Sequence, residues 1–153
     1  MNDDLKRRDF GLFFLLMIIT IGFYGFYLIP KLGVSVNHLI KKDAFKFKQV
    51  LLVGIFTLGL GLIVFEVMYA YKLENNPEYT HEKWSNHNLG VYVLILNMLA
   101  LILAFMPGGW NFLLSCVAGS WATWLIQYQV NCYLDINTQD VALKDKQDTD
   151  LGN

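Results

Sequence analysis

Hydrophobic residues occur along the chain in long blocks separated by short polar segments, and this pattern predicts helices that cross a membrane. The first block, residues 10–30, contains no charged residue. As one helix it would be about 31 Å long, which matches the hydrocarbon thickness of a bilayer. Further blocks occupy residues 49–71, 89–106 and 110–133. The sequence therefore predicts an all-α fold, an integral membrane helical bundle of about four transmembrane helices.

The third and fourth blocks are joined by a predicted tight turn. Pro107 fixes its own φ, and Gly108 and Gly109 adopt backbone conformations that other residues avoid. We expect an antiparallel helical hairpin here. Because helices that are apolar on every side leave no polar face for water, a membrane fits better than a water-soluble helical core. Aromatic residues near the predicted helix ends, where they favour the headgroup level, are Tyr69, Tyr71, Trp84, Trp110 and Tyr133.

The polar segments complete the predicted domain organisation. Residues 1–9 form a basic flank, residues 10–133 the transmembrane domain, and residues 134–153 an acidic tail whose composition predicts disorder. Residues 31–48 carry apolar residues at helical spacing among lysines, which is typical of an amphipathic helix on the membrane surface. A solvated connector is an equally good interpretation. The lysines expected to contact lipid headgroups are Lys41, Lys42, Lys46 and Lys48.

The path of the first block has two interpretations. Four full crossings separate residues 31–48 from the N-terminus, the 72–89 loop and the tail, and basic residues then lie on both sides in similar number. The positive-inside rule does not choose an orientation in that case. If the block instead bends near Gly22 and Gly25 and returns to the same face, both basic segments are cytoplasmic. We favour the full crossing because a bend exposes non-helical backbone to lipid.

A short pattern occurs twice, at residues 18–22 and 55–59, and both copies read Ile-x-Thr-x-Gly. Each copy follows a leucine pair and precedes an aromatic-rich stretch that ends in Lys-Leu. The repeat indicates duplication of one helical unit, although so short a match in apolar sequence also arises by chance.

Residues 15–37 contain a Thr-x-Gly-x-Tyr-Gly-x-Tyr stretch that is followed by a lysine and a later asparagine. This stretch resembles the opening motif of the domain-of-unknown-function 4234 family, small bacterial and archaeal membrane proteins. Residues 124–131 are similar to the Gln-x-x-x-Asn ending of such chains. The resemblance implies a multi-pass protein of the bacterial cytoplasmic (inner) membrane and no particular activity. The residues that carry it are Thr20, Gly22, Tyr24, Gly25, Tyr27, Lys31, Asn37, Gln127 and Asn131.

Glu66 is the only acidic residue well inside a predicted span. A carboxylate within a membrane is costly unless it is paired, protonated or in contact with water, so Glu66 is the first candidate polar site. The simpler interpretation is that its side chain reaches the interface from near the end of the span. Asn97 in the third block is a candidate partner.

Small and hydrogen-bonding residues recur every four positions in the fourth block, so they share one face of the predicted helix. Such a stripe allows another helix to approach closely and to form hydrogen bonds with it. A water-lined path for a substrate is the second interpretation. The stripe consists of Ser115, Gly119, Thr123, Gln127 and Asn131.

Patterns typical of an enzyme, a metal site or a nucleic-acid-binding protein are missing from the sequence. The formal net charge of −1 gives no basic face for nucleic acid. His81 and His87, with Glu78 and Glu82 nearby, fit no zinc signature. We therefore expect no catalytic residue, no metal and no cofactor.

The expected function is that of a non-catalytic packing or interaction module, or an accessory subunit, in a lipid bilayer. Its partners would be lipid and either further copies of itself in a homo-oligomer or a larger membrane complex. The alternative is a small carrier or channel component that uses Glu66.

Overall fold

The computed structural model describes residues 7–20, 23–76 and 88–151, and only the backbone of residues 137–151. Regular structure in these residues is entirely helical, which confirms the predicted all-α class for the described chain. The helices are α1 (Phe10–Ile19), α2 (Tyr24–Ile40), α3 (Phe47–Phe56), α4 (Leu60–Glu74), α5 (Leu89–Phe105) and α6 (Gly109–Leu151).

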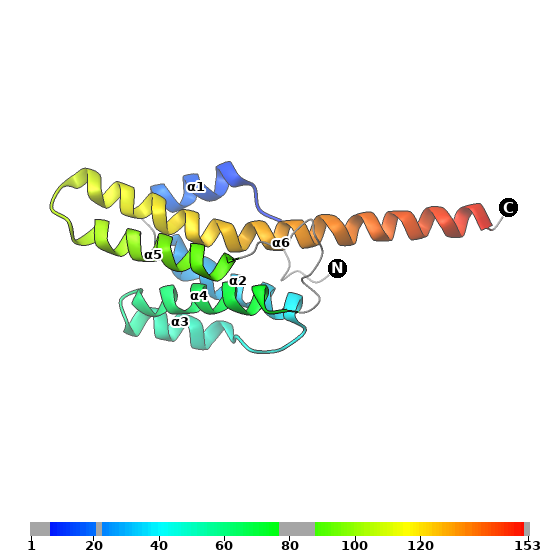
Figure 1. The fold of residues 1–153 in the computed structure, drawn as a ribbon, viewed down its shortest axis with the longest axis horizontal. Coiled ribbons are helices and arrows are strands. Elements are labelled where there is room, and N and C mark those ends of the chain that lie inside the picture. Colours follow the sequence, from blue (N-terminus) through cyan, green and yellow to red (C-terminus); the bar gives the residue numbers. More distant parts are fainter. Residues whose placement is uncertain (1–6, 21–22, 77–87, 152–153) are drawn as a thin grey trace.

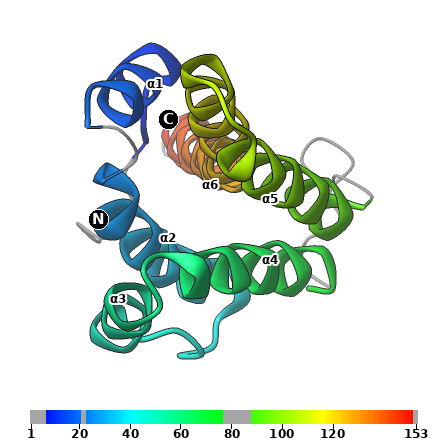
Figure 2. The same cartoon turned by 90° about the vertical axis from the view of Figure 1, so that its left-hand side faces the viewer.

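The helices pair as three hairpins, α1/α2, α3/α4 and α5/α6, whose turns lie at the same end of the bundle (Figure 1). The α2–α3 connection and the end of α4 lie at the opposite end. Viewed from the turn end, α1 lies beside α6, and α3 lies beside α2 and α4 (Figure 2). We call the first end the turn end and the second the open end.

The turns of the first two hairpins have the same hydrogen bonds. Thr20 Oγ1 donates to the backbone carbonyl four residues earlier at 2.8 Å and accepts from the backbone N–H four residues later at 3.0 Å. Thr57 makes the same two bonds at 2.6 and 2.7 Å. Each threonine thus adds a second hydrogen bond to a carbonyl at the end of one helix, and it satisfies an N–H at the start of the next. Thr20 and Thr57, the threonines of the two repeat copies, thus lie at the reversal points of two helical hairpins.

Two predicted spans differ from the observed helices. Residues 10–30 divide between α1 and α2, and residues 49–71 divide between α3 and α4. At the second break Leu58 and Gly59 both have positive φ, which ends α3 and reverses the chain. Apolar composition predicts that a segment is buried or in lipid, but it does not distinguish one long helix from two short antiparallel ones. In the part of the chain that the structure describes, no helix is both long and apolar enough to cross a bilayer.

The predicted amphipathic helix over residues 31–48 is not a separate element. Its first ten residues belong to α2, and residues 41–46 form a non-helical connection to α3. Asn37 fixes this connection, because its Oδ1 accepts from Ala44 N at 3.1 Å and Phe45 N at 2.9 Å while its Nδ2 donates to Phe45 O at 2.6 Å. Asn37 is the asparagine of residues 15–37, the stretch that carries the family resemblance, and these bonds give it a structural role.

The acidic segment predicted to be disordered, residues 134–153, instead continues α6 as far as Leu151 (Figure 1). No glycine or proline occurs between Gly119 and Gly152, so no residue interrupts the helix there. Composition indicated that this segment lacks a packed core, and that property does not prevent a helix from extending.

Candidate functional site

A cavity of about 320 Å³, the central cavity, lies where α2, α4, α5 and α6 meet. Most of its walls are apolar, including Met17, Phe26 and Ile29 from the first hairpin. Its polar lining residues come from α4, α5 and α6, and all of them were candidates from the sequence: Glu66, Asn97, Ser115 and Thr123.

Glu66 is buried in the cavity wall with only 2% of its surface exposed. Its Oε1 accepts the hydroxyl hydrogen of Thr123, and its Oε2 accepts from Asn97 Nδ2 at 3.0 Å. Among the described residues no cation pairs with this carboxyl group. The structure therefore places Glu66 away from the surface, in contrast to the interpretation in which its side chain reaches the interface. Two neutral donors from two other helices hold it instead.

The first three residues of the predicted stripe on α6 face helices of the same chain. Ser115 Oγ donates to Ala100 O of α5 at 2.7 Å. A Cβ atom at Gly119 would lie 3.9 Å from the Cβ of Ala100, so α5 and α6 approach closely here. Thr123 contacts Glu66 of α4 as described. This part of the stripe therefore packs against α4 and α5 within the chain. A water-filled path along the stripe stays a separate proposal.

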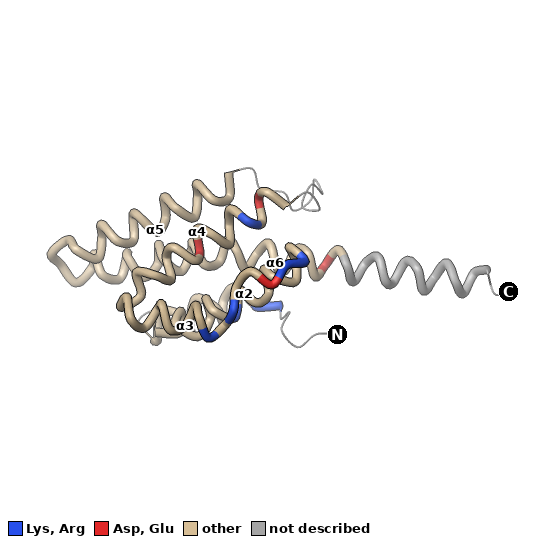
Figure 3. The backbone as a smooth tube through the Cα atoms, turned by 90° about the horizontal axis from the view of Figure 1, so that it is seen from below, with Lys and Arg blue, Asp and Glu red and all other residues tan. Residues whose placement is uncertain are grey.

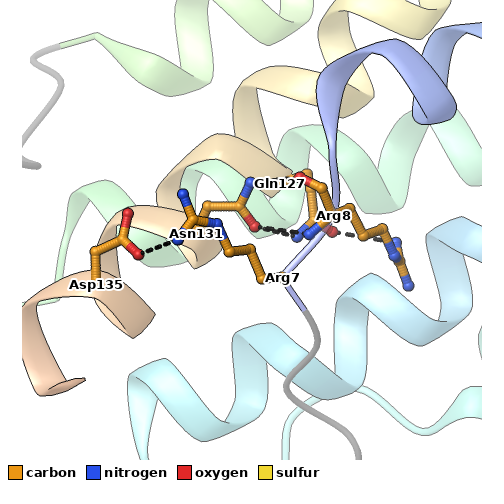
Figure 4. Close-up of polar contacts among 5 residues, drawn as sticks. All are labelled: Arg7, Arg8, Gln127, Asn131 and Asp135. Atoms are coloured by element: carbon orange, nitrogen blue, oxygen red, sulfur yellow. Dashed lines mark hydrogen bonds and ion pairs between the residues drawn. The ribbon is translucent and has the colours of Figure 1, made fainter.

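The last two stripe residues, Gln127 and Asn131, hold the segment that precedes α1 (Figure 4). Arg8 Nη1 donates to Gln127 Oε1 at 3.1 Å, Arg8 N donates to Asn131 Oδ1 at 3.2 Å, and Asn131 Nδ2 donates to Arg8 O at 2.9 Å. Gln127 Nε2 also donates to Asn131 Oδ1 at 2.9 Å. We call these contacts the Arg8 network. Gln127 is thus engaged one turn away from Thr123 and is not part of the cavity lining.

Arg8 is the functional candidate that sequence reasoning missed. Burial lowers the pKa of its guanidinium group, and the nearby Tyr24 and Tyr27 act in the opposite direction. An arginine remains charged at neutral pH even so. Its neighbour Arg7 forms an exposed ion pair with Asp135 at 2.8 Å (Figure 4). The only available signal was the position of two arginines just before an apolar block, which was interpreted as a basic flank without a partner.

Other candidates from the sequence are exposed or outside the described residues. Lys41, Lys42, Lys46 and Lys48 are all exposed at the α2–α3 connection and the start of α3, and their contact with lipid headgroups stays a prediction. The loop residues Glu78, His81, Glu82 and His87, like Trp84, lie outside the residues that the structure describes. In the described ranges, no three His, Cys, Asp or Glu side chains are grouped as a metal site requires.

Exposed apolar side chains and charged side chains lie in different parts of the bundle. Large apolar side chains at the hairpin turns are between 74% and 90% exposed: Phe23, Phe56, Leu58, Phe105 and Trp110. Residues 10–30, 49–65 and 89–134 contain no charged residue, so the turns carry no Lys, Arg, Asp or Glu. Figure 3 shows the charged residues of the described chain away from these turns. So large an exposed apolar surface is typical of a protein that contacts lipid or another protein.

Comparison with known families finds that residues 8–78 match the family described as Domain of unknown function (DUF4234). The match extends from Arg8 across both Thr-centred hairpins to just beyond α4, while α5 and α6 follow it. It confirms the resemblance noted in residues 15–37. No curated protein and no solved structure matches the chain.

Proposed function

We propose that this chain, whose residues 8–78 match the DUF4234 family, is a non-catalytic membrane module whose three helical hairpins enter the bilayer from one side. The observation that carries the proposal is the separation of the exposed apolar side chains at the turn end from the charged side chains toward the open end. The apolar turn end would lie among acyl chains, and the charged open end would lie at the headgroups. Acyl chains stabilise an exposed apolar surface, and the headgroup layer stabilises a charged one.

The helix lengths fit this arrangement. The ten residues of α1 or of α3 extend about 15 Å, half the thickness of the hydrocarbon layer. The 17 residues of α5 extend about 26 Å, so the α5/α6 turn with Trp110 would approach the far headgroups. One-sided entry therefore requires no single helix to cross the bilayer.

The hydrogen bonds of Thr20 and Thr57 reduce the free-energy cost of exposing non-helical backbone to lipid, which was the reason for favouring a full crossing from the sequence. A chain reversal in lipid leaves backbone N–H and C=O groups without water, and each unsatisfied group is costly. The two hydroxyl groups each satisfy one backbone N–H at the start of the following helix and add a second bond to a carbonyl that already accepts a backbone N–H. The charge distribution also improves, because the basic residues before α1 and those around the α2–α3 connection then lie together on the cytoplasmic side. The proposed location is the bacterial cytoplasmic membrane.

Cysteine labelling tests the arrangement. In a Cys116→Ser/Cys132→Ser background, Lys42→Cys and Lys72→Cys are each expected to react with a membrane-impermeant maleimide from the cytoplasmic side only. Both positions are exposed, one in the α2–α3 connection and one near the end of α4. Four full crossings place these two positions on opposite sides of the membrane. Labelling of the two from opposite faces of sealed vesicles is therefore the result that contradicts one-sided entry.

A matched control for this experiment is Leu58→Cys at the α3/α4 turn. Leu58 is 90% exposed on the protein surface, so the protein itself does not shield a cysteine there. In the chain unfolded in denaturant this cysteine is expected to react as readily as Lys42→Cys. In vesicles it is expected to stay unlabelled from either side because lipid covers it. Ready labelling of Leu58→Cys in intact vesicles would place the turn in water and refute the insertion itself.

Packing within the chain already uses the α6 stripe, so association with further copies or with a larger membrane complex is proposed for other surfaces. The outward faces of α5 and α6 carry exposed apolar side chains, among them Ile95, Ile102 and Leu113. In this role the chain would act as an accessory subunit.

The central cavity supports a second candidate function, that of a small carrier or channel component. A pocket with apolar walls and a few convergent polar groups is typical of a small-molecule site, and Glu66 is the ionisable group in its lining. Glu66→Gln is expected to abolish a pH-dependent flux in liposomes while the fold is retained. Absence of any flux with the unmodified protein would remove this candidate and leave the membrane module.

A further inference from the structure

A second cavity, of about 350 Å³, lies between the segment that precedes α1, α1 itself and the first turns of α2. Its charged and polar lining includes Arg8, Tyr24, Tyr27 and Lys31, and its apolar wall includes Leu12 and Leu16 of α1. We call it the Arg8–Lys31 pocket. Three of its polar residues, Tyr24, Tyr27 and Lys31, belong to the stretch that carries the family resemblance, and their side chains have no role in the helical turns described above.

The positive charges of this pocket are incompletely balanced. Arg7 is paired with Asp135, but in the described chain neither Arg8 nor Lys31 has an acidic partner. The remaining charged lining residue is Asp9, whose carboxylate accepts from Leu12 N at 3.1 Å as the N-cap of α1. Two cations therefore face one carboxylate that is already engaged, and a partly buried unpaired cation is stabilised by an anion.

The donors are fixed in position before any ligand binds. The Arg8 network holds the guanidinium group through Gln127 and the backbone of Arg8 through Asn131. Lys31 Nζ donates to Tyr27 Oη at 3.2 Å and lies 5.6 Å from the centre of its ring. Because Tyr27 Oη accepts this bond, its own hydrogen is available to an external acceptor. A site with preset donors loses less free energy to ordering when a ligand binds.

We propose that the Arg8–Lys31 pocket binds the phosphate group of an anionic phospholipid. A guanidinium group, an ammonium group and two phenol hydroxyl groups together match the several acceptor oxygens of a phosphate. The exposed Leu12 and the half-buried Leu16 continue the pocket along α1 toward the turn end, where they would contact the acyl chains. The lipid source of the phosphate rests on the proposed one-sided membrane entry, whereas recognition of the phosphate group rests on the pocket alone.

Native mass spectrometry of the full chain in an uncharged detergent tests the pocket without a bilayer. Phosphatidylglycerol is expected to bind, and diacylglycerol, which has the acyl chains without a phosphate, is not. Lys31→Gln is expected to weaken phosphatidylglycerol binding about tenfold, the effect of one lost charge-assisted contact. The Arg8→Gln/Lys31→Gln variant is expected to weaken it further.

The matched control is Lys72→Gln, which removes one exposed lysine outside the pocket. Its affinity is expected to change less than about twofold, because surface charges contribute little to a local contact. Equal losses in the pocket and control variants, or equal binding of diacylglycerol, would overturn the proposal. Because Arg8 also holds α6, Lys31→Gln is the variant that leaves the Arg8 network intact and keeps the test independent of folding.

Inorganic phosphate and glycerol 3-phosphate distinguish the two sources of the ligand. If either displaces phosphatidylglycerol at similar concentration, the phosphate site is supported and a free phosphate compound is its ligand. If only the lipid binds, the acyl contacts along α1 are supported as well. Since this measurement uses detergent and the cysteine experiment uses vesicles, failure of phosphate binding and failure of one-sided entry give separate results.

Discussion

The Asn97→Leu/Thr123→Val variant is expected to lose about 3 kcal/mol or more of its free energy of unfolding, since an ionisable group that is buried and loses its partners carries a penalty of this size. Both donors to the Glu66 carboxyl group would be gone, and no cation in the described chain would replace them. Either single variant is expected to lose less, because one donor would remain. Equilibrium unfolding in detergent micelles, followed by tryptophan fluorescence, measures the difference.

Substitutions at Glu66 itself provide the controls. Glu66→Gln is expected to be close to neutral, because its amide oxygen can accept from Asn97 while its NH₂ group donates to Thr123. Adding Glu66→Leu to the Asn97→Leu/Thr123→Val variant is expected to recover most of the lost stability, since replacing every member of a buried polar group by apolar residues is often neutral. A triple variant as unstable as the double variant would show that packing, and not the carboxyl group, causes the loss.

The sequence predicted the polar residues of the central cavity better than it predicted the helices around them. Glu66, Asn97 and Thr123 stand out because polar groups are rare in their apolar surroundings, and rarity can be seen without a structure. Their meeting depends on how α4, α5 and α6 pack. The spacing of four along α6 placed Ser115 and Thr123 on one face, but it did not indicate which helix that face contacts.

The break points of the first two apolar blocks could have been predicted from the repeat. The Ile-x-Thr-x-Gly pattern was recognised as a sign of duplication, but its threonine and glycine were not interpreted as a chain reversal. Gly59 has a φ of 93°, and Thr57 supplies the hydrogen bonds that a reversal requires. Length alone favoured one spanning helix because each block matches the bilayer thickness.

The Arg8 network illustrates a contact that no local pattern reveals. Arg8 and Asn131 are 123 positions apart, yet the backbone N–H and C=O of Arg8 both bond to the side-chain amide of Asn131. The expected similarity of residues 124–131 to a family ending lies outside the matched residues 8–78, and it did not indicate what Gln127 and Asn131 contact. Only the antiparallel placement of α1 against α6 brings the segment that precedes α1 to the middle of α6.

Gly33→Ala is expected to lower the free energy of unfolding by about 1 to 3 kcal/mol, the usual effect of an extra methyl group in a closely packed core. A Cβ atom at this position would lie 2.5 Å from Tyr69 Oη and 2.8 Å from Tyr69 Cζ. The ring cannot easily move away, because it is fully buried and packs edge-on against Phe45 at 4.6 Å between ring centres. Unfolding in detergent micelles again measures the change. The matched control is Gly119→Ala, whose Cβ would meet Ala100 at 3.9 Å and is expected to be neutral or slightly stabilising.

Tyr69→Phe separates the clash of the added methyl group with the Tyr69 hydroxyl group from its clash with the Tyr69 ring. Tyr69 Oη is buried and has no hydrogen-bond partner in the described chain, so removing it is expected to leave stability unchanged or to raise it by about 1 kcal/mol. In the Gly33→Ala/Tyr69→Phe variant the nearest clashing atom is absent while Cζ remains. Partial recovery of the Gly33→Ala loss is therefore expected. A loss equal to that of Gly33→Ala alone would show that the ring, rather than its hydroxyl group, sets the distance between α2 and α4.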